Sequence, residues 1–185
     1  MVSVLLLLLL HDGVVRDLGS LLREVARTHL PRPELIGTPA VRHPQQELDG
    51  LHLVRGRRVG LVTNHTGVTR AAGDGTVSTI DLLHGSPDLD LVALYSPEHG
   101  IRGRAEAGER VESGVDAATG LPIHSLYSTG QKPTPEMLDG IDVLVFDIQD
   151  IGARYYTYVW TMALAMEAAG EAGLPFLVLD RPNPI

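Results

Sequence analysis

The chain contains several short, nearly continuous apolar runs rich in leucine and β-branched side chains. Four of them predict strands, at Arg58–Thr63, Asp90–Tyr95, Asp142–Ile148 and Pro175–Asp180. A strand buried on both faces has no polar face, so it is a continuous apolar run rather than an alternating one. A fifth strand is expected at Pro122–Tyr127. The pattern therefore predicts a mostly parallel sheet that is covered on both faces.

Segments with helical signals lie between these runs. Helices are predicted over residues 78–85, 134–140 and 156–172, with Ser78 or Thr79 as the cap of the first and Thr134 as the cap of the second. In the third, one stripe at helical spacing is predicted to pack in the core: Val159, Met162, Ala163, Met166 and Ala169. Strands that alternate with helices predict an α/β fold with a doubly wound, mostly parallel sheet and helices on both of its faces.

Residues 1–47 differ from the rest of the chain. The first ten residues, MVSVLLLLLL, are compatible with a degenerate signal, a mis-assigned start or a buried first helix. No Lys or Arg precedes this run and no small-x-small cleavage site follows, which favours the cytoplasm over export. A short helix at Leu18–Leu30 and a proline-rich linker at Pro31–Gln46 are expected. The folded domain is predicted to span residues 48–185.

Composition narrows the possible functions. A chain of 185 residues that is 44% hydrophobic can form one domain with a substantial core, and its net charge of −8 argues against nucleic acid as a partner. Without cysteine, disulfides and thiolate chemistry are excluded. The leucine run is too short to span a bilayer, so no stable membrane insertion is expected.

Polar clusters follow the predicted strands at their carboxyl ends. These clusters are TNHTG, SPEHG, DIQDIGARYY and DRPNP. Ligands of doubly wound sheets bind at this edge, so the clusters predict one cleft. Its expected lining is Asn64, His65, Glu98, His99, Asp147, Gln149, Asp150, Arg154, Tyr155, Tyr156, Asp180, Arg181 and Asn183.

Motifs limit the chemistry of this cleft. The G-x-G-x-x-G, phosphate-loop and nucleophile-elbow patterns are absent from the sequence, so no cofactor is predicted. A metal site from His65, His99, Asp147 and Asp150 is conceivable, but the spacing has no dense ligand motif, and no metal is predicted.

Paired carboxylates fit the cleft better. Glycoside hydrolysis uses one carboxyl group as an acid and a second as base, nucleophile or orienting group, and Glu98 with Asp147 or Asp150 can supply both. Simpler roles remain open. Glu98 can cap a turn, Asp147 can bind backbone amides, Arg154 can pair with Asp150, and the two histidines can hold their neighbours in place.

Several long motifs also carry a family resemblance. GLVTNHTGV, SPEHGIRG, TGLPIHSLY, PTPEMLDGIDVLVFDIQDIGARYYTY and LPFLVLDRPNPI occur in order between about Gly56 and Ile185. In these motifs the chain resembles the bacterial exo-β-N-acetylmuramidase NamZ family. The resemblance implies a Rossmann-like domain, a smaller carboxy-terminal domain beyond it, and release of N-acetylmuramic acid from the non-reducing end of peptidoglycan fragments.

The resemblance also implies roles for individual residues. Glu98, in the E-H-G motif, is the implied catalytic residue, and Arg154 and Arg181 are candidates for binding the lactyl carboxylate of the sugar. Tyr155, Tyr156 or Tyr158 can pack on the sugar, and its polar rim can bond a further set of side chains: Asn64, His99, Gln149 and Asn183. Retaining, inverting and substrate-assisted routes all remain open.

Relatives in the resembled family continue beyond LDRPNPI. We therefore expect the smaller carboxy-terminal domain to be absent here and this chain by itself to have little activity. The expected partner is a muropeptide or muramyl disaccharide, and the oligomeric state stays open. Two alternatives remain, a non-catalytic muropeptide-binding module and a metal-dependent hydrolase.

Overall fold

The fold is described from a computed structural model. It describes residues 6–8, 53–70, 75–97, 100–102, 113–127, 130–152 and 156–179. The expected helix at Leu18–Leu30 and the linker at Pro31–Gln46 lie outside these residues.

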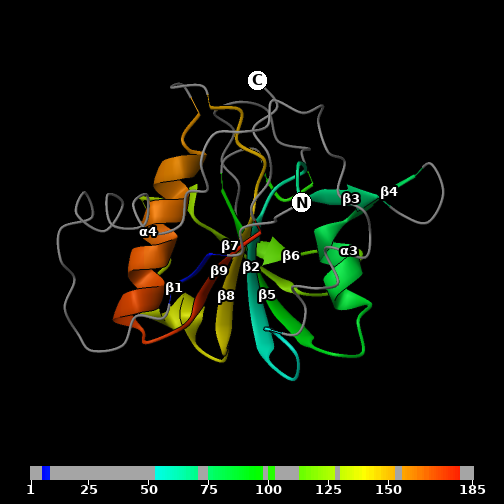
Figure 1. The fold of residues 1–185 in the computed structure, drawn as a ribbon, viewed down its shortest axis with the longest axis horizontal. Coiled ribbons are helices and arrows are strands. Elements are labelled where there is room, and N and C mark those ends of the chain that lie inside the picture. The colour runs from blue at the N-terminus through cyan, green and yellow to red at the C-terminus, as the bar shows by residue number, and fades with distance from the viewer. Residues whose placement is uncertain are drawn as a thin grey trace, which may run out of the picture.

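A seven-stranded sheet forms the centre of the molecule (Figure 1). Across the sheet the strands are β1 (Leu6–Leu8), β9 (Phe176–Val178), β8 (Val143–Asp147), β2 (Arg58–Thr63), β5 (Asp90–Ser96), β7 (Pro122–Ser125) and β6 (Gly114–Val115). β2 pairs in parallel with β5 and β8, β5 with β7, and β8 with β9. The edge strands β1 and β6 are antiparallel to their neighbours. The predicted doubly wound, mostly parallel sheet is confirmed.

The strand order places the switch point of the sheet between β2 and β8. From β2 the chain moves outward to β5 and β7, then returns to β8 on the other side of β2 and continues to β9. In open α/β sheets the ligand crevice lies at such a switch point, outside the carboxyl ends of the strands. The segments that follow β2 and β8 therefore border the expected ligand crevice.

Helices cover the two faces of the sheet (Figure 1). On one side lies α3 (Thr79–His84), preceded by a small antiparallel sheet of β3 (Val68–Arg70) and β4 (Thr76–Ser78). On the other side lies α4 (Tyr158–Glu171), and a 3₁₀ turn, η2 (Pro135–Leu138), precedes β8. Ser78 caps α3 as predicted, since its Oγ accepts from the Asp81 backbone N–H at 3.1 Å.

Side chains along β8 alternate between the two cores. Leu144 and Phe146 pack in the cluster that contains α4, whereas Val143 and Val145 pack in the cluster that contains α3. Because side chains alternate along a strand, Asp147 follows Val145 onto the α3 side. This alternation brings the last side chain of β8 beneath the start of α3.

Two expectations are corrected by the described residues, and two further features were not predicted. In the predicted stripe of α4, Met166 and Ala169 are buried, but Val159 is 54% exposed. The buried face is rotated towards Tyr158, Thr161, Ala165 and Ala168. Leu6–Leu8 form a strand and not a helix, because their backbone extends the sheet beside β9. The β3–β4 pair and β6 are too short and too polar for their hydrophobic pattern to predict them.

Within the described ranges, no helix is long and apolar enough to span a membrane.

Candidate functional site

The structure describes part of the predicted cleft. Asn64, His65, Asp147, Gln149, Asp150 and Tyr156 are described, whereas Glu98, His99, Arg154, Tyr155, Asp180, Arg181 and Asn183 lie outside the described residues. The described polar residues of the β2 and β8 ends share one hydrogen-bond network. That part of the predicted convergence is seen directly.

Asn64 directly follows β2 and is 2% exposed. Its Oδ1 accepts from the Thr66 backbone N–H at 2.9 Å and from the Thr66 hydroxyl at 2.6 Å. A backbone N–H can only donate, so these bonds fix which end of the amide is the oxygen. The Nδ2 group at the other end is buried and has no hydrogen-bond partner. A buried donor without a partner costs roughly 1–3 kcal/mol, which makes Asn64 a candidate for binding a ligand acceptor.

Thr66 connects the segment after β2 to the segment after β8. Its Oγ1 donates to Asn64 and accepts from the Gln149 backbone N–H at 2.9 Å. The Gln149 side chain is occupied within its own segment, because its Nε2 donates to the Asp150 carbonyl at 2.8 Å. Gln149 thus helps to hold the loop, and Thr66 holds the two loops together across the switch point.

Asp150 has one satisfied and one unsatisfied carboxyl oxygen. Its Oδ1 accepts from the Gly152 backbone N–H at 2.6 Å, which tightens the turn after β8. Its Oδ2 is buried and has no hydrogen-bond partner among the described residues. The predicted partner Arg154 lies outside the described residues. An acceptor held in this way can receive a proton or a hydrogen bond from a ligand.

Asp147, the last residue of β8, is fully buried. Its Oδ2 accepts from the Thr79 hydroxyl at 2.5 Å, and its carbonyl accepts from the Thr63 hydroxyl at 2.8 Å. Gly67 covers it closely, since a Cβ on Gly67 would lie 2.3 Å from Thr63 Oγ1 and 3.2 Å from Asp147 Oδ2. Asp147 therefore ties β2, β8 and the start of α3 together.

A cavity of about 240 Å³ opens on the α3 side of this network. It is lined by Asn64, His65, Gly67, Ser78, Ile80, Ile101 and Arg102. These residues come from the end of β2, the start of α3 and the segment after β5. The cavity thus lies next to the carboxyl ends of β2 and β5.

Arg102 is a site residue that the sequence prediction missed. Its guanidinium donates to both carboxyl oxygens of Asp116, at 2.9 and 2.8 Å, and to both of Asp81, at 3.3 and 3.0 Å. The hydrogen bonds from Arg102 lower the pKa of the Asp116 carboxyl to about 2, and they also lower the pKa of Asp81. The signal in the sequence is an arginine four residues after Glu98, but its two acidic partners are distant in the chain.

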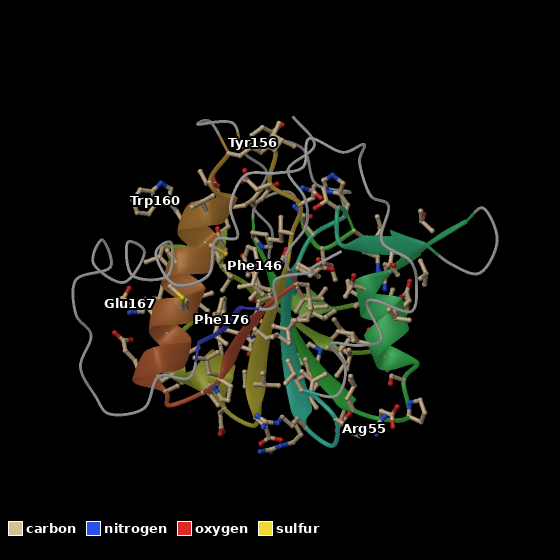
Figure 2. The ribbon with its side chains drawn as sticks, in the orientation of Figure 1. Arg55, Phe146, Tyr156, Trp160, Glu167 and Phe176 are labelled. Atoms are coloured by element: carbon tan, nitrogen blue, oxygen red, sulfur yellow. The ribbon has the colours of Figure 1, made fainter. Side chains whose placement is uncertain are left out.

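Tyr156 lies just before α4, near the upper end of that helix in Figure 2. It is 46% exposed and its ring centroid is 5.9 Å from that of Tyr158. Trp160 projects from the same end of α4 and is 64% exposed. No group of three His, Asp or Glu side chains within the described ranges is arranged to hold a metal ion.

The fold and the network define an α/β protein with a candidate polar ligand site at the switch point of a doubly wound sheet. Residues 59–185 match the sequence model described as "Exo-beta-N-acetylmuramidase NamZ, N-terminal". The chain belongs to this family, and the predicted resemblance is confirmed.

Relatives and solved structures agree with this assignment. The peptidoglycan β-N-acetylmuramidase NamZ of Bacillus subtilis (strain 168) is 55% identical over 131 residues, which are 71% of this chain and 31% of the relative. Two structures of DUF1343 family proteins from Bacteroides fragilis NCTC 9343 also match. Their TM-scores are 0.66 and 0.59 at 52% and 35% identity, and each match covers 76% of this chain and 34% of the other. The chain thus spans about a third of the length of these relatives.

Proposed function

We propose that this chain carries the catalytic cleft of an exo-acting glycosidase that releases N-acetylmuramic acid from the non-reducing end of peptidoglycan fragments. Family membership and the name of the Bacillus subtilis relative support the reaction class. The structural observation that carries the proposal is the pair of buried polar atoms without hydrogen-bond partners, Asn64 Nδ2 and Asp150 Oδ2, on either side of the switch point.

The carboxyl groups receive different roles in this proposal. Glu98 acts as the acid that protonates the leaving oxygen, and Asp150 supplies the second carboxyl group, because one of its oxygens has no partner among the described residues. The complete burial of Asp147 and its bond to Thr79 support a positioning role for this residue. The predicted catalytic role of Asp147 is thereby narrowed to holding the β2 and β8 ends in place.

Substrate binding is proposed for the remaining predicted residues. Asn64 offers a fixed donor, and Arg154 and Arg181 remain the candidates for the lactyl carboxylate. The exposed Tyr156 ring is available to pack on a sugar, with Tyr155, His99 and Asn183 as further candidates. A muropeptide or muramyl disaccharide is the proposed substrate.

The experiment measures release of N-acetylmuramic acid from a muramyl disaccharide by this chain, with the Bacillus subtilis relative as positive control. We expect this chain by itself to turn over more slowly than the relative, and Glu98→Gln and Asp150→Asn each to reduce the turnover that remains by roughly 10²–10⁴-fold, the range of a lost general acid or base. Asp147→Asn should reduce stability more than it changes the pH profile. Asp142→Asn, at the opposite end of β8, is the matched control and should keep the original rate.

Two results would contradict the proposal. Binding of N-acetylmuramic acid without its release, unchanged in Glu98→Gln, would favour a non-catalytic muropeptide-binding module. Loss of turnover with a chelator and its recovery with zinc or manganese would favour a metal-dependent hydrolase.

A further inference from the structure

The cavity beside Asn64 has the size of a subsite. Pockets that hold a whole drug-sized ligand measure about 300–1,000 Å³, and this cavity has about 240 Å³. It can therefore hold one substituent of a sugar and the adjoining part of the ring, but not an oligosaccharide. The question is which substituent its walls fit.

The polar wall is formed by Asn64, His65, Ser78 and Arg102, and Asn64 carries a buried donor without a partner among the described residues. Asn64 lines the cavity, its Oδ1 is held by the backbone N–H of Thr66, and its Nδ2 is buried without a partner. A ligand carbonyl oxygen would satisfy this donor. An ammonium group on the ligand would not, because it has no acceptor.

The apolar wall is formed by Ile80 and Ile101. These side chains are 1% and 6% exposed, and both belong to the core cluster on the α3 side of the sheet. A small apolar group placed against them would gain the usual benefit of leaving water. The cavity thus combines a donor with a surface that suits a methyl group.

The charges of the described residues beside the cavity disfavour an anionic substituent. Arg102 lines the cavity, but it is paired with two carboxylates, Asp81 and Asp116, so the cluster carries one net negative charge. Asp147 is buried on the other side of Gly67. A carboxylate from the ligand would meet a like-charged environment, whereas a neutral amide would not.

We propose that this cavity binds the 2-acetamido group of an N-acetylated amino sugar. The acetamido carbonyl accepts from Asn64 Nδ2, and its methyl group packs against Ile80 and Ile101. The lactyl carboxylate of a muramyl unit is therefore bound elsewhere. This inference rests on the proposed function for the identity of the sugar, but not for the chemistry of the cavity.

The first experiment needs no variant. N-acetylglucosamine, glucosamine and glucose are titrated separately into the isotope-labelled chain, and the Asn64 side-chain amide and the Ile80 and Ile101 methyl groups are followed by NMR. We expect N-acetylglucosamine to shift these resonances saturably, and the other two sugars to leave them unchanged. Equal shifts with all three sugars, or no shift with any, would overturn the inference.

The second experiment removes the donor. Asn64→Asp keeps an oxygen for Thr66 and replaces Nδ2 by a second oxygen, so the affinity for N-acetylglucosamine should fall by about tenfold or more. Gln131→Glu makes the same amide-to-acid change away from the cavity and should retain the original affinity. Ile101→Phe fills the apolar side and provides an independent variant should Asn64→Asp fail to fold; it too should abolish the response. Unchanged affinity in either folded cavity variant would refute the proposed subsite.

The subsite and the proposed function can fail separately. Release of N-acetylmuramic acid with undiminished preference for the acetamido group in Asn64→Asp would refute only the subsite. Binding of N-acetylglucosamine at Asn64 in a chain whose bound muramyl sugar is never released would refute only the hydrolase.

Discussion

An aspartate links β2 to β8 at each end of this strand pair, but the two aspartates differ in their exposure and in their hydrogen-bond partners. At the amino ends, Asp142 accepts from the Arg58 backbone N–H at 2.8 Å and from its guanidinium at 2.8 and 3.2 Å, and its side chain is 40% exposed. At the carboxyl ends, Asp147 is fully buried and accepts from the hydroxyls of Thr79 and Thr63.

This difference indicates that the amino ends of β2 and β8 serve stability, whereas their carboxyl ends form the candidate ligand site. The Arg58–Asp142 pair satisfies its own hydrogen bonds and presents nothing to a ligand. Around Asp147 the loops are held as tightly, yet Asn64 Nδ2 and Asp150 Oδ2 are left without partners. Buried polar atoms are normally paired, so this end of the sheet retains a destabilising feature that a ligand can relieve.

The largest effect on stability is expected at Gly67, which is tightly packed at the carboxyl ends of β2 and β8. In Gly67→Ala the new Cβ would lie 2.3 Å from Thr63 Oγ1, so β2, the loop or Asp147 must shift. We expect the free energy of unfolding to fall by about 3 kcal/mol, the upper part of the range for overpacking. Urea unfolding measures this change in the free energy of unfolding. Gly114→Ala, where a Cβ meets nothing within 4 Å, is the control, and equal losses in the two variants would contradict the close packing.

The next effect comes from the hydroxyl that binds the Asp147 carboxylate. Thr79→Val keeps the shape of the side chain but leaves Asp147 Oδ2 without this donor. Hydrogen bonds to charged groups contribute about 1.5–3 kcal/mol, so we expect a loss of about 2 kcal/mol in the free energy of unfolding. Thr79→Ser retains the hydroxyl and should recover most of it. A serine variant as unstable as the valine variant would show that the methyl group matters instead.

A smaller effect is expected from the Arg102 cluster that borders the cavity. The folded-state pKa of Asp116 is about 2, below its ordinary value of 3.8, because Arg102 donates to it. A carboxyl group whose pKa is lowered in the folded state stabilises the fold at pH values above its unfolded-state pKa. This contribution is lost as pH falls from about 4 to about 2. Urea midpoints across this range should fall less steeply in Asp116→Asn than in the original chain. Parallel profiles would contradict the role of this ion pair.

Much of the fold could be predicted from local patterns. β2 has the predicted bounds, and β5 and β8 differ by one residue at the ends, because strands buried on both faces leave a continuous apolar signal. The position of Asn64 at the ligand edge follows from the same signal. By contrast, Val159 was placed in the core by spacing alone, although 54% of it is exposed. Spacing identifies a helical stripe but does not fix the rotation of the helix on its sheet.

The parts of the site that could not be predicted depend on contacts between distant segments. Thr79 reaches Asp147 across 68 residues of sequence, and Thr66 reaches Gln149 across 83. Arg102 pairs with Asp81 and Asp116 only because α3 and two loops meet beside the cavity. The two threonines, Gly67 and Arg102 belong to no sequence motif whose spacing predicts these contacts. Their roles emerge only once the sheet has brought the loops together.

The smallest effect on stability is expected for the Arg58–Asp142 pair at the amino ends of β2 and β8. The pKa of Asp142 is also lowered to about 2, mainly by its hydrogen bond from the Arg58 side chain, so it contributes stability over the same acidic range as Asp116. Both partners are exposed, however, and solvent-exposed pairs are screened by salt. In Asp142→Asn the amide oxygen can still accept from the Arg58 N–H, which should limit the loss further.

We expect the difference between Asp142→Asn and the original chain to disappear in 1 M salt, where the Debye length is about 3 Å. The difference for the less exposed Asp116→Asn should largely persist, because buried pairs are screened much less than exposed ones. Equal salt sensitivity of the two variants would remove the distinction drawn between the exposed end of the sheet and the ligand edge.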